Sequence, residues 1–557
     1  LGALDQARRS ARTRTNPPAV TLTALIGPPG TGKTTAIARE INEAITVEGL
    51  PPDRLMALTF TRAAAEQLRT RCQLPKRRGR TLHSLALAAV TDGIGYRPAL
   101  VQLDDADRRG ITLDDAAEPE GDGDDGPAAK VPSWPEWLAR EALPHQWGQP
   151  HGIEALDVAR ARCTPRDEWD SGLLAIDAAW TRYKTEHQLW DFADLIDGLA
   201  DLHPTAPPFE TWKIWVDEAQ DLTIAEARLV RAWAGVCEVR LIGDDDQAIY
   251  GWRGSDPRES LGAVEPEYTT ILTQSYRCPA RISDAAQAFM GRATWRVAKH
   301  WEPRPDDDGR IMSWDTWTHE EVLCLAERKA HAGASVLLLA HQTWSLTAWA
   351  ATARRLGIAH GMESETRWHS SPSASVKGPH AGSRALCRLA GGHTLRGAEV
   401  GACLQHVRTA SLQGTRRNII AHHAEEGLTL DDLAALAVGD FDPAAPWRWW
   451  VASLTKAAAA STQHPLACIE RNGPEAWAVG SGRIGITTIH GAKGLEADLV
   501  ILDGSWSRRM EADWSSPDPD VRDEMRRTWY VALTRARHEA VILGASPGMS
   551  WARTHTE

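Results

Sequence analysis

The sequence predicts an α/β protein built on parallel sheets, and three observations support this fold class. Short apolar runs of the kind that form buried parallel strands recur along the 557 residues. Helical patterns lie between these runs. The first run also enters a glycine-rich loop that is followed at once by a helical pattern, as in a strand–loop–helix unit. A chain of this length is expected to fold as roughly two to four domains.

The apolar runs fall into two groups, which predicts two sheets separated by helix-rich and loop-rich stretches. The first group accompanies the glycine-rich loop, and the second group lies in the C-terminal half of the chain. Each run is short, and each is followed by a turn or by a helical pattern. The predicted strands are 22–26, 55–60, 214–216 and 239–242 in the first group and 336–339, 484–486, 499–502 and 540–543 in the second.

Two stretches interrupt this rhythm. Residues 104–126 are acidic and contain several glycines, which predicts a mobile surface loop. Residues from about 367 to 475 show no clear strand rhythm, and their first part, HSSPSASVKGPHAGS, is typical of a linker. Tryptophan supplies 25 of the aromatic residues. We expect most of these side chains in cores or between domains.

Composition favours an intracellular globular protein. Hydrophobic residues make up 43% of the chain and charged residues 24%, and we find neither an apolar run long enough to cross a bilayer nor a signal peptide. We therefore expect a cytoplasmic protein with no membrane partner. The first residue is Leu1 rather than Met, which points to a trimmed or processed N-terminus. The eight cysteines lie far apart without a C-x-x-C pair, which favours reduced, structural thiols over a zinc or iron–sulfur site.

The net charge of −12 does not exclude a nucleic-acid partner, because a binding channel needs only local positive potential. Lys and Arg outnumber Asp and Glu over residues 1–100, whereas residues 101–130 are acidic. The first segment can therefore line a polyanion. A basic cluster within it has two equally good interpretations, phosphate contacts or a solvated loop. Its members are Lys76, Arg77, Arg78 and Arg80.

The strongest motif is GPPGTGKT at residues 27–34, which predicts a phosphate loop. Glycines let successive backbone N–H groups turn toward phosphate oxygens, and Lys33 neutralises the β and γ oxygens. The hydroxyl of Thr34 is placed to reach Mg²⁺ at the start of a helix. The motif therefore predicts ATP and Mg²⁺ as cofactors. The residues predicted to hold the nucleotide here are Gly27, Pro28, Pro29, Gly30, Thr31, Gly32, Lys33, Thr34 and Thr35.

A second motif, WKIWVDEAQD at residues 212–221, places two acids at the end of an apolar strand. We expect Asp217 to hold Mg²⁺ through its water shell and Glu218 to orient and polarise the attacking water. Two carboxylates at a strand end also occur as a solvated cap. Beside a phosphate loop, the catalytic interpretation is favoured.

Several further segments occur in an order that resembles the UvrD/Rep group of superfamily 1 helicases. Two early segments resemble DNA-contact motifs of that family, and another resembles the segment that precedes its Mg²⁺ strand. The resemblance therefore spans nearly the whole chain. The segments are LTFTRAAAEQLRTR (58–71), RTLHSL (80–85), DFADLI (191–196), GDDDQAIYGWRGSD (243–256), LTQSYRCP (272–279), TTIHGAKGLEADLVIL (487–502) and RRTWYVALTRAR (526–537).

The resemblance implies two RecA-like P-loop NTPase domains, each interrupted by a mainly helical insertion. ATP is expected between the two domains, so that hydrolysis and domain closure become one event. The implied first domain covers 1–95 and 200–280, and its insertion covers 96–199. The implied second domain covers 281–366 and 476–557, and a short accessory insertion covers 367–475.

Carried over position by position, the resemblance implies further ATP contacts. Gln247 is expected to sense the γ-phosphate, and Tyr276 to stack on adenine. Arg277 and Arg535 are expected to be the paired cations on the γ-phosphate. The alternative is that each forms a surface salt bridge that contributes little to stability. The resemblance also assigns Glu496 to the ribose and Gln6 to the adenine edge, the latter at a spacing from the phosphate loop that looks longer than usual.

The resemblance implies a single-stranded DNA track as well. Base-on-aromatic stacking tolerates any sequence, which suits a motor that must step on every base. Outside these motifs, a lone aromatic or histidine residue is more often part of a core. The residues assigned to DNA are Phe60, Thr61, His83, Ser84, Tyr250, Trp252, Arg253, His490 and Gly491.

We therefore expect ATP-driven 3′→5′ movement on single-stranded DNA with unwinding, in DNA repair, recombination or replication. The alternative is an ATP-gated remodelling subunit that displaces proteins without processive unwinding. A nucleotide kinase or GTPase is disfavoured, because neither requires the GWRG or ALTRA segments. The implied partners are single-stranded DNA, single-strand/duplex junctions and a repair or replication protein, and the chain is expected to be a monomer or weak dimer.

The sequence departs from the usual family wording at two positions and in one region. Ser275 stands where Asn commonly precedes the Tyr-Arg pair, and Ala340 stands where an arginine is frequent. The accessory region 367–475 is short, and the chain ends soon after Arg537. Reduced duplex-contacting elements are expected, so unwinding is less secure than translocation. No attached nuclease domain is expected.

Overall fold

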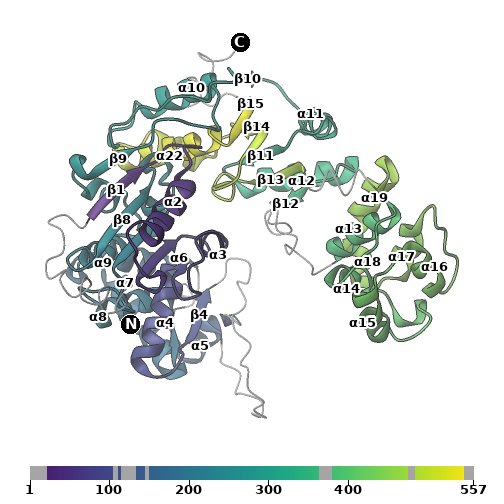
Figure 1. Ribbon diagram of the computed structural model, residues 1–557, viewed down its shortest axis with the longest axis horizontal. Coiled ribbons are helices and arrows are strands. Elements are labelled where there is room, and N and C mark those ends of the chain that lie inside the picture. Colours follow the sequence, from purple (N-terminus) through teal and green to yellow (C-terminus); the bar gives the residue numbers. More distant parts are fainter. Residues whose placement is uncertain are drawn as a thin grey trace. The chain divides into compact units, whose positions relative to one another are not determined.

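The computed structural model describes residues 22–103, 111–113, 133–144, 150–362, 379–474 and 483–544, which fold into two units. Unit 1 takes in the described residues of Leu1–Tyr276 and Trp295–Glu302. Unit 2 takes in those of Arg277–Thr294 and Pro303–Glu557. Each unit contains its own six-stranded sheet (Figure 1). All strand pairs in these two sheets are parallel, which confirms the predicted α/β fold class.

The sheet of unit 1 brings three loops of the predicted site to one edge. Strands β7, β8 and β1 are neighbours, and they run parallel. The loops that leave their carboxyl ends therefore emerge side by side. In order across the sheet, the strands are β3 (Gly79–Thr81), β2 (Leu55–Thr59), β7 (Lys213–Val216), β8 (Glu238–Gly243), β1 (Leu22–Ile26) and β9 (Thr269–Ile271).

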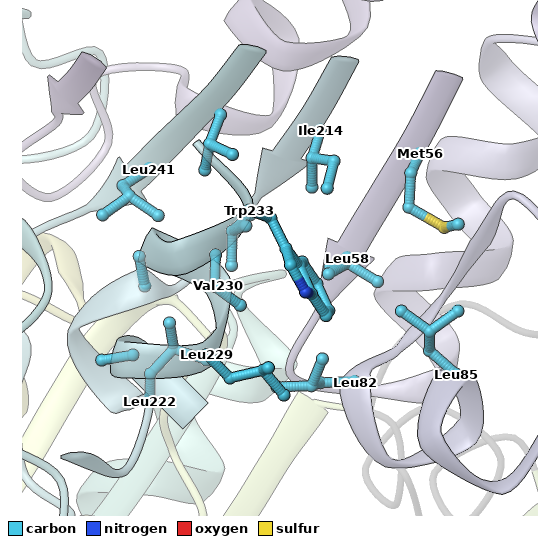
Figure 2. Close-up of a cluster of buried hydrophobic side chains, with 14 of the residues drawn as sticks. Met56, Leu58, Leu82, Leu85, Ile214, Leu222, Leu229, Val230, Trp233 and Leu241 are labelled. Carbon is cyan, nitrogen blue, oxygen red and sulfur yellow. The ribbon is translucent and has the colours of Figure 1, made fainter. Parts of the chain in front are cut away.

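Helices cover both faces of this sheet, because the strands alternate their apolar side chains between two cores. One core joins Met56, Leu58 and Ile214 to Trp233 of the covering helix α9 (Figure 2). The other core joins strand residues such as Trp215 to the opposite helices. The first face is covered by α4 (Leu82–Ile94), α8 (Phe192–Leu202) and α9 (Ile224–Trp233), and the second by α2 (Lys33–Thr46) and α3 (Arg62–Arg71).

The chain between α4 and α8 forms a smaller subdomain of unit 1. Its core is aromatic, with Trp134 stacked on Trp137 at a ring-centroid distance of 5.4 Å and with Trp180 stacked on Tyr183. A three-stranded sheet of order β5-β4-β6 accompanies the helices. The elements are β4 (Ala99–Leu103), β5 (Ile111–Leu113), α5 (Trp134–Arg140), α6 (Pro150–Ala161), α7 (Ser171–His187) and β6 (Leu189–Trp190).

Unit 2 repeats the parallel plan. Its core combines the strand residues with α11 and α12, which pack on the sheet. The strands, in order across the sheet, are β10 (Arg310–Trp314), β15 (Ala536–Leu543), β14 (Ala497–Asp503), β11 (Val336–Ala340), β13 (Ile484–Thr488) and β12 (Gly361–Met362). The helices are α10 (Ala280–Met290), α11 (His319–His331), α12 (Thr343–Leu356), α21 (Arg508–Trp514) and α22 (Pro519–Leu533).

The described residues 379–474 of unit 2 form a helical subdomain with its own core, which includes Leu389, Leu404 and Trp450. Helix α19 joins it to the rest of the unit, because Arg471 pairs with Glu327 of α11 at 3.1 Å. The helices are α13 (Pro379–Ala390), α14 (Ala398–Leu404), α15 (Arg416–Glu426), α16 (Leu430–Leu436), α17 (Pro446–Ser453), α18 (Lys456–Ser461) and α19 (Gln463–Asn472).

Every strand that the sequence predicts is present, with ends that differ by a few residues at most. The sequence did not predict β3, β9, β10, β12 or the small third sheet, because most of these strands are short or carry few apolar residues. The predicted acidic loop lies outside the described residues except for 111–113, and so does the linker up to 378.

The expectations for cysteine and tryptophan can also be compared with the structure. All eight cysteines are free, and most are buried, but Cys163 is exposed. Trp134, Trp215 and Trp349 are among the fully buried side chains, as expected for core residues. No helix in the described part of the chain is both long and apolar enough to span a membrane.

Candidate functional site

The phosphate loop leaves the carboxyl end of β1 in the conformation that its composition predicts. Gly32 is the N-cap of α2 and has a φ of 82°, a left-handed conformation that glycine adopts without strain. Lys33 begins the helix and folds back, so that its Nζ donates a hydrogen bond to the Gly27 carbonyl at 2.7 Å. A side chain at Gly27 would collide with Lys33. The loop therefore presents a helix N-terminus and a cation together, which is a favourable place for phosphate.

Residues 275 and 276 brace this loop from the strand next to β1. The buried hydroxyl of Ser275 donates to the Pro29 carbonyl at 2.7 Å, and the backbone N–H of Tyr276 donates to the Gly30 carbonyl at 2.9 Å. The side chain of Tyr276 is 70% exposed. The departure from Asn at position 275 thus keeps a polar contact to the loop, and the aromatic ring beside the loop is free to receive a flat ligand.

The two carboxylates follow β7 at the same edge of the sheet. Asp217 is buried, and its Oδ1 accepts the backbone N–H of Glu218 at 3.0 Å. Glu218 has a φ of 54°, which is unusual for a residue with a side chain. Six other described residues with side chains share this left-handed conformation, so it does not by itself mark a site. What fits the catalytic interpretation is that both acids follow β7, at the same edge of the sheet as the phosphate loop.

A chain of hydrogen bonds connects Glu218 to Gln247, the residue predicted to sense the γ-phosphate. The fully buried Gln220 of the turn η4 (Ala219–Asp221) donates from Nε2 to Glu218 at 2.6 Å, and its Oε1 accepts the backbone N–H of Asp244 at 3.0 Å. Gln247, at the end of η5 (Asp245–Gln247), donates to Asp244 Oδ2 at 2.7 Å. The loops after β7 and β8 are thus joined through their side chains. The sequence did not single out Gln220 or Asp244.

Four of the residues predicted to bind DNA form one aromatic and cationic cluster, and three of the four lie three to six residues after Gln247. The rings of Phe60 and Tyr250 stack at 5.2 Å, and Trp252 lies 6.3 Å from Tyr250. The guanidinium of Arg253 lies 5.6 Å from the Phe60 ring centroid and 5.9 Å from that of Tyr250. Trp252 is 58% exposed and Phe60 is 38% exposed. An exposed aromatic surface with a cation suits base stacking and phosphate contact.

The subdomain helix α6 holds this cluster in place. Arg162 donates to the carbonyl of Gly251 at 3.1 Å, within the turn η6 (Gly251–Arg253). Gly254 ends the turn with a φ of 89° and lies so close to Ala161 that no side chain fits there. The GWRG segment therefore depends on glycines for its conformation and for its contact with α6.

The remaining predicted DNA contacts of unit 1 have structural partners of their own. The Thr61 hydroxyl caps α3 by accepting the Ala64 N–H at 3.2 Å. His83 lies 3.6 Å from Glu226, and burial, together with the nearby Arg253, lowers its pKa. Ser84 follows the cap of α4, where its backbone N–H donates to the Thr81 hydroxyl at 3.2 Å.

The basic cluster is only partly available for phosphate. Arg78 is buried, and it donates to the Thr211 hydroxyl at 2.9 Å and to the Phe209 carbonyl at 2.6 Å. Burial lowers the pKa of Arg78 and of Arg80. Arg80 donates to the Ser84 carbonyl. These two arginines therefore support the fold, and Lys76 and Arg77 remain for the solvent-facing loop.

In unit 2, the predicted ATP contacts gather around one carboxylate. Glu496 accepts from Arg277 Nε at 2.5 Å and pairs with Arg537 at 2.6 Å. Burial of Glu496 opposes its charge, but Arg277 and Arg537 outweigh burial and lower its pKa. Arg535 is buried and donates from Nε to the Val531 carbonyl at 2.9 Å. Arg535 also donates to the carbonyl of Leu495, the residue before Glu496, at 3.3 Å. The structure thus places Arg277, Arg535 and also Arg537 around Glu496.

His490 and Gly491 follow β13 in unit 2. The ring of His490 meets that of His341 edge to face at 6.0 Å, and the Gly491 N–H donates to the Thr488 hydroxyl at 3.0 Å. Gln6 lies outside the described residues. Within the described residues, no group of three or more His, Cys, Asp or Glu side chains could hold a metal ion. Thr34 and Asp217 still fit Mg²⁺, which takes few protein ligands when phosphate oxygens and water supply the rest.

Two protein families match this chain where the two groups of site residues lie. A family described as "AAA domain" matches residues 13–253, and the "UvrD-like helicase C-terminal domain" matches residues 470–546. The chain belongs to the UvrD/Rep-type group of superfamily 1. The first match contains the phosphate loop, the carboxylate pair and the aromatic cluster of this UvrD/Rep-type protein. The second match contains Glu496, Arg535 and His490.

Curated relatives agree with this assignment. The chain is 26% identical over 321 residues to the ATP-dependent DNA helicase PcrA of Staphylococcus epidermidis, which covers 52% of this chain and 41% of that protein. It is 27% identical over 300 residues to the protein of the same name from Staphylococcus aureus, which covers 48% and 38%. The UvrD/Rep-type chain described here therefore aligns with about two fifths of the length of these relatives.

Proposed function

We propose that this UvrD/Rep-type protein hydrolyses ATP to move 3′→5′ along single-stranded DNA and to open duplexes. The observation that carries the proposal is that one loop, the loop after β8, contains both Gln247 and the aromatic residues assigned to DNA. Gln247 belongs to the hydrogen-bonded chain that reaches Glu218, and the half-buried ring of Tyr250 and the exposed ring of Trp252 follow it within five residues. A change at the nucleotide can therefore reach the DNA surface through a few covalent bonds.

Unit 1 supplies the chemistry of hydrolysis in this proposal. Lys33 and the N-terminus of α2 bind the phosphates, and Glu218 orients the attacking water and takes up its proton. Gln247 contacts the γ-phosphate or the water that attacks it. Mg²⁺, when bound at Thr34 and Asp217, neutralises the charge on the β and γ oxygens. Tyr276 offers its exposed ring to adenine.

Unit 2 supplies cations in this proposal. Arg277 and Arg535 stabilise the charge of the transferring phosphoryl group, and Glu496 binds the ribose. In the structure, Glu496 holds Arg277. ATP binding therefore requires this ion pair to rearrange or to receive the ribose hydroxyls beside it. Phosphate-contacting roles for His490 and Gly491 also belong to this proposal.

The track of unit 1 fits single strands better than duplex DNA. Exposed rings stack on unpaired bases, and stacking carries about 1–3 kcal/mol per base without regard to sequence. Arg253, which lies over two of the rings, is placed to meet the backbone. The substrate proposed is therefore single-stranded DNA, including the single strand at a junction. Polarity follows from the family alone.

The proposal is tested by ATP hydrolysis with and without single-stranded DNA and by unwinding of duplexes with a 3′ or a 5′ tail. We expect DNA to stimulate hydrolysis and only the 3′-tailed duplex to open. Stimulated hydrolysis with neither duplex opened would favour the alternative, an ATP-gated subunit that displaces proteins from DNA. Equal rates of ATP hydrolysis with and without DNA would contradict the assignment of these residues to DNA.

A further inference from the structure

The segment Trp295–Glu302 belongs to unit 1, although the chain on either side of it belongs to unit 2. We call this segment the strap. Its two ends are fixed in unit 1. The ring of Trp295 lies against Gly262, where a side chain would collide with it, and its face receives Arg258 at 5.5 Å. The backbone of Glu302 pairs with the strand that leads to Ser275, through hydrogen bonds of 2.6 and 2.9 Å.

The middle of the strap contacts three adjacent carboxylates that lie outside it, in the loop after β8. Asp244, Asp245 and Asp246 are fully buried, and like charges at this density are costly without cations. The Nζ of Lys299 lies 3.4 Å from Asp244, 2.6 Å from Asp245 and 2.9 Å from Asp246, and its side chain is 0% exposed. Arg296 contacts Asp246, with its Nε 3.1 Å from one carboxylate oxygen.

The two cations of the strap differ in their contact with the hydrogen-bonded chain that leads to Glu218. Asp244 accepts from Gln247, and its backbone N–H donates to Gln220, which in turn donates to Glu218. Lys299 lies 3.4 Å from Asp244, whereas the ion pair of Arg296 is with Asp246. Burial opposes the charge of Lys299, but the three carboxylates outweigh burial and raise its pKa. Lys299 thus stays charged throughout the physiological range.

We propose that Lys299 is a positioning residue for ATP hydrolysis. By its contact with Asp244, it fixes the chain Glu218–Gln220–Asp244–Gln247 in the geometry that hydrolysis needs. The inference rests on the proposed function, because it gives Glu218 and Gln247 their roles. Lys299 contacts neither the phosphate loop nor the aromatic cluster in the described structure, so its effect falls on the rate of the chemical step. Small displacements of positioned groups cost large factors in rate.

The test compares Lys299→Met with Arg296→Met, which each remove one cation from the same three carboxylates. We expect both variants to lose thermal stability. Only Lys299→Met should lose kcat, by tenfold or more, with the affinity for a fluorescent ATP analogue changed less than threefold. Equal kcat in the two variants, or parallel losses of kcat and of ATP affinity in Lys299→Met, would overturn the positioning role.

A second pair of variants tests the same inference if Lys299→Met does not fold. Asp244→Asn and Asp245→Asn each remove one carboxylate beside Lys299, but the described hydrogen bonds to the Gln220 and Gln247 side chains are those of Asp244. We expect the loss of kcat in Asp244→Asn alone, and we expect Lys299→Arg, which keeps the charge, to lose less kcat than Asp244→Asn. Wild-type kcat in Asp244→Asn would reject the inference.

The wild-type protein is measured in the same series, with and without single-stranded DNA. A wild type that does not hydrolyse ATP would reject the proposed function. A wild type that hydrolyses ATP, together with a fully active Lys299→Met, would reject only the role of Lys299.

Discussion

The side-chain amide of Gln220 donates a 2.6 Å hydrogen bond to the carboxylate of Glu218, and the oxygen of the same amide accepts the backbone N–H of Asp244 at 3.0 Å. This contact orients one oxygen of Glu218. A carboxylate held in this way is prepared to act as a general base, because its geometry is set before the substrate arrives.

Glu218→Gln should abolish turnover and spare binding. The glutamine keeps the size of the side chain, and its amide oxygen can still accept from Gln220, but it cannot take up a proton. We expect kcat to fall at least a hundredfold, within the range for loss of a general base. ATP and DNA affinities should change little. Steady-state hydrolysis and equilibrium binding measure the two effects, and substantial residual DNA-stimulated turnover would refute the role assigned to Glu218.

Trp252→Ala should weaken DNA binding without lowering basal hydrolysis. Removing one exposed ring from the cluster with Tyr250 should cost about 1–3 kcal/mol, or roughly 5- to 150-fold in affinity for single-stranded DNA. Trp212→Ala is the matched control, since Trp212 is also exposed, at 41%, but lies beside Arg54 at the start of β7. Fluorescence anisotropy with labelled oligonucleotides measures both. An equal loss of basal and stimulated hydrolysis would instead mean that Trp252 is structural.

Ser275→Ala should raise the KM for ATP. The variant leaves the Pro29 carbonyl without its 2.7 Å hydrogen bond, so the phosphate loop loses one brace. We expect a loss of about 1 kcal/mol, which corresponds to roughly a fivefold higher KM. Ser275→Asn, which restores the usual family residue, tests whether the longer side chain can make the same contact. Unchanged KM in Ser275→Ala would show that the loop does not need this brace.

The stability of unit 2 should fall in mild acid because of His341. Burial, with a smaller contribution from His490, lowers the pKa of His341 to about 4 in the folded protein, whereas an unfolded histidine titrates near ~6.5. Between these values the unfolded chain binds more protons, so the free energy of unfolding decreases as the pH falls from about 6.5 toward 4. Asp513 and Arg509 also face His341 and partly offset one another.

His341→Gln should remove that part of the pH dependence. Between pH 6.5 and 4, the free energy of unfolding should fall by on the order of 1–2 kcal/mol less in the variant than in the wild type. This figure allows for the partial exposure of the side chain. Thermal unfolding at several pH values between 7 and 4 measures the difference. Parallel curves for the two proteins would assign the acid sensitivity to other groups.

Labelling of native protein with a thiol reagent should begin at Cys163. This residue is exposed, whereas burial raises the pKa of Cys387 and of Cys403 to about 12 and keeps these thiols protonated. Burial also raises the pKa of Cys163, so the reaction is expected to be slow at neutral pH. Cys163→Ser should remove the first labelling phase seen by mass spectrometry. A first phase at a buried cysteine would indicate local opening of the fold.

The sequence alone determined the fold class, four strands of each six-stranded sheet and the motifs of the nucleotide site. These features are local. A buried parallel strand is a short apolar run, and a phosphate loop needs its glycines, Lys33 and Thr34 next to one another in the chain. The exposed state of Trp252 and Tyr276 also agrees with the roles predicted for them.

Only the tertiary structure decided which side chains connect these motifs. Lys299 lies 54 residues from Asp245, and no periodicity in the sequence marks a lysine that will be fully buried. Arg78 belongs to a basic run that suggested phosphate contacts, yet it is buried against Phe209 and Thr211. Such pairings depend on which loops the parallel strands bring to one edge of a sheet, and burial then makes a partner for each charge obligatory.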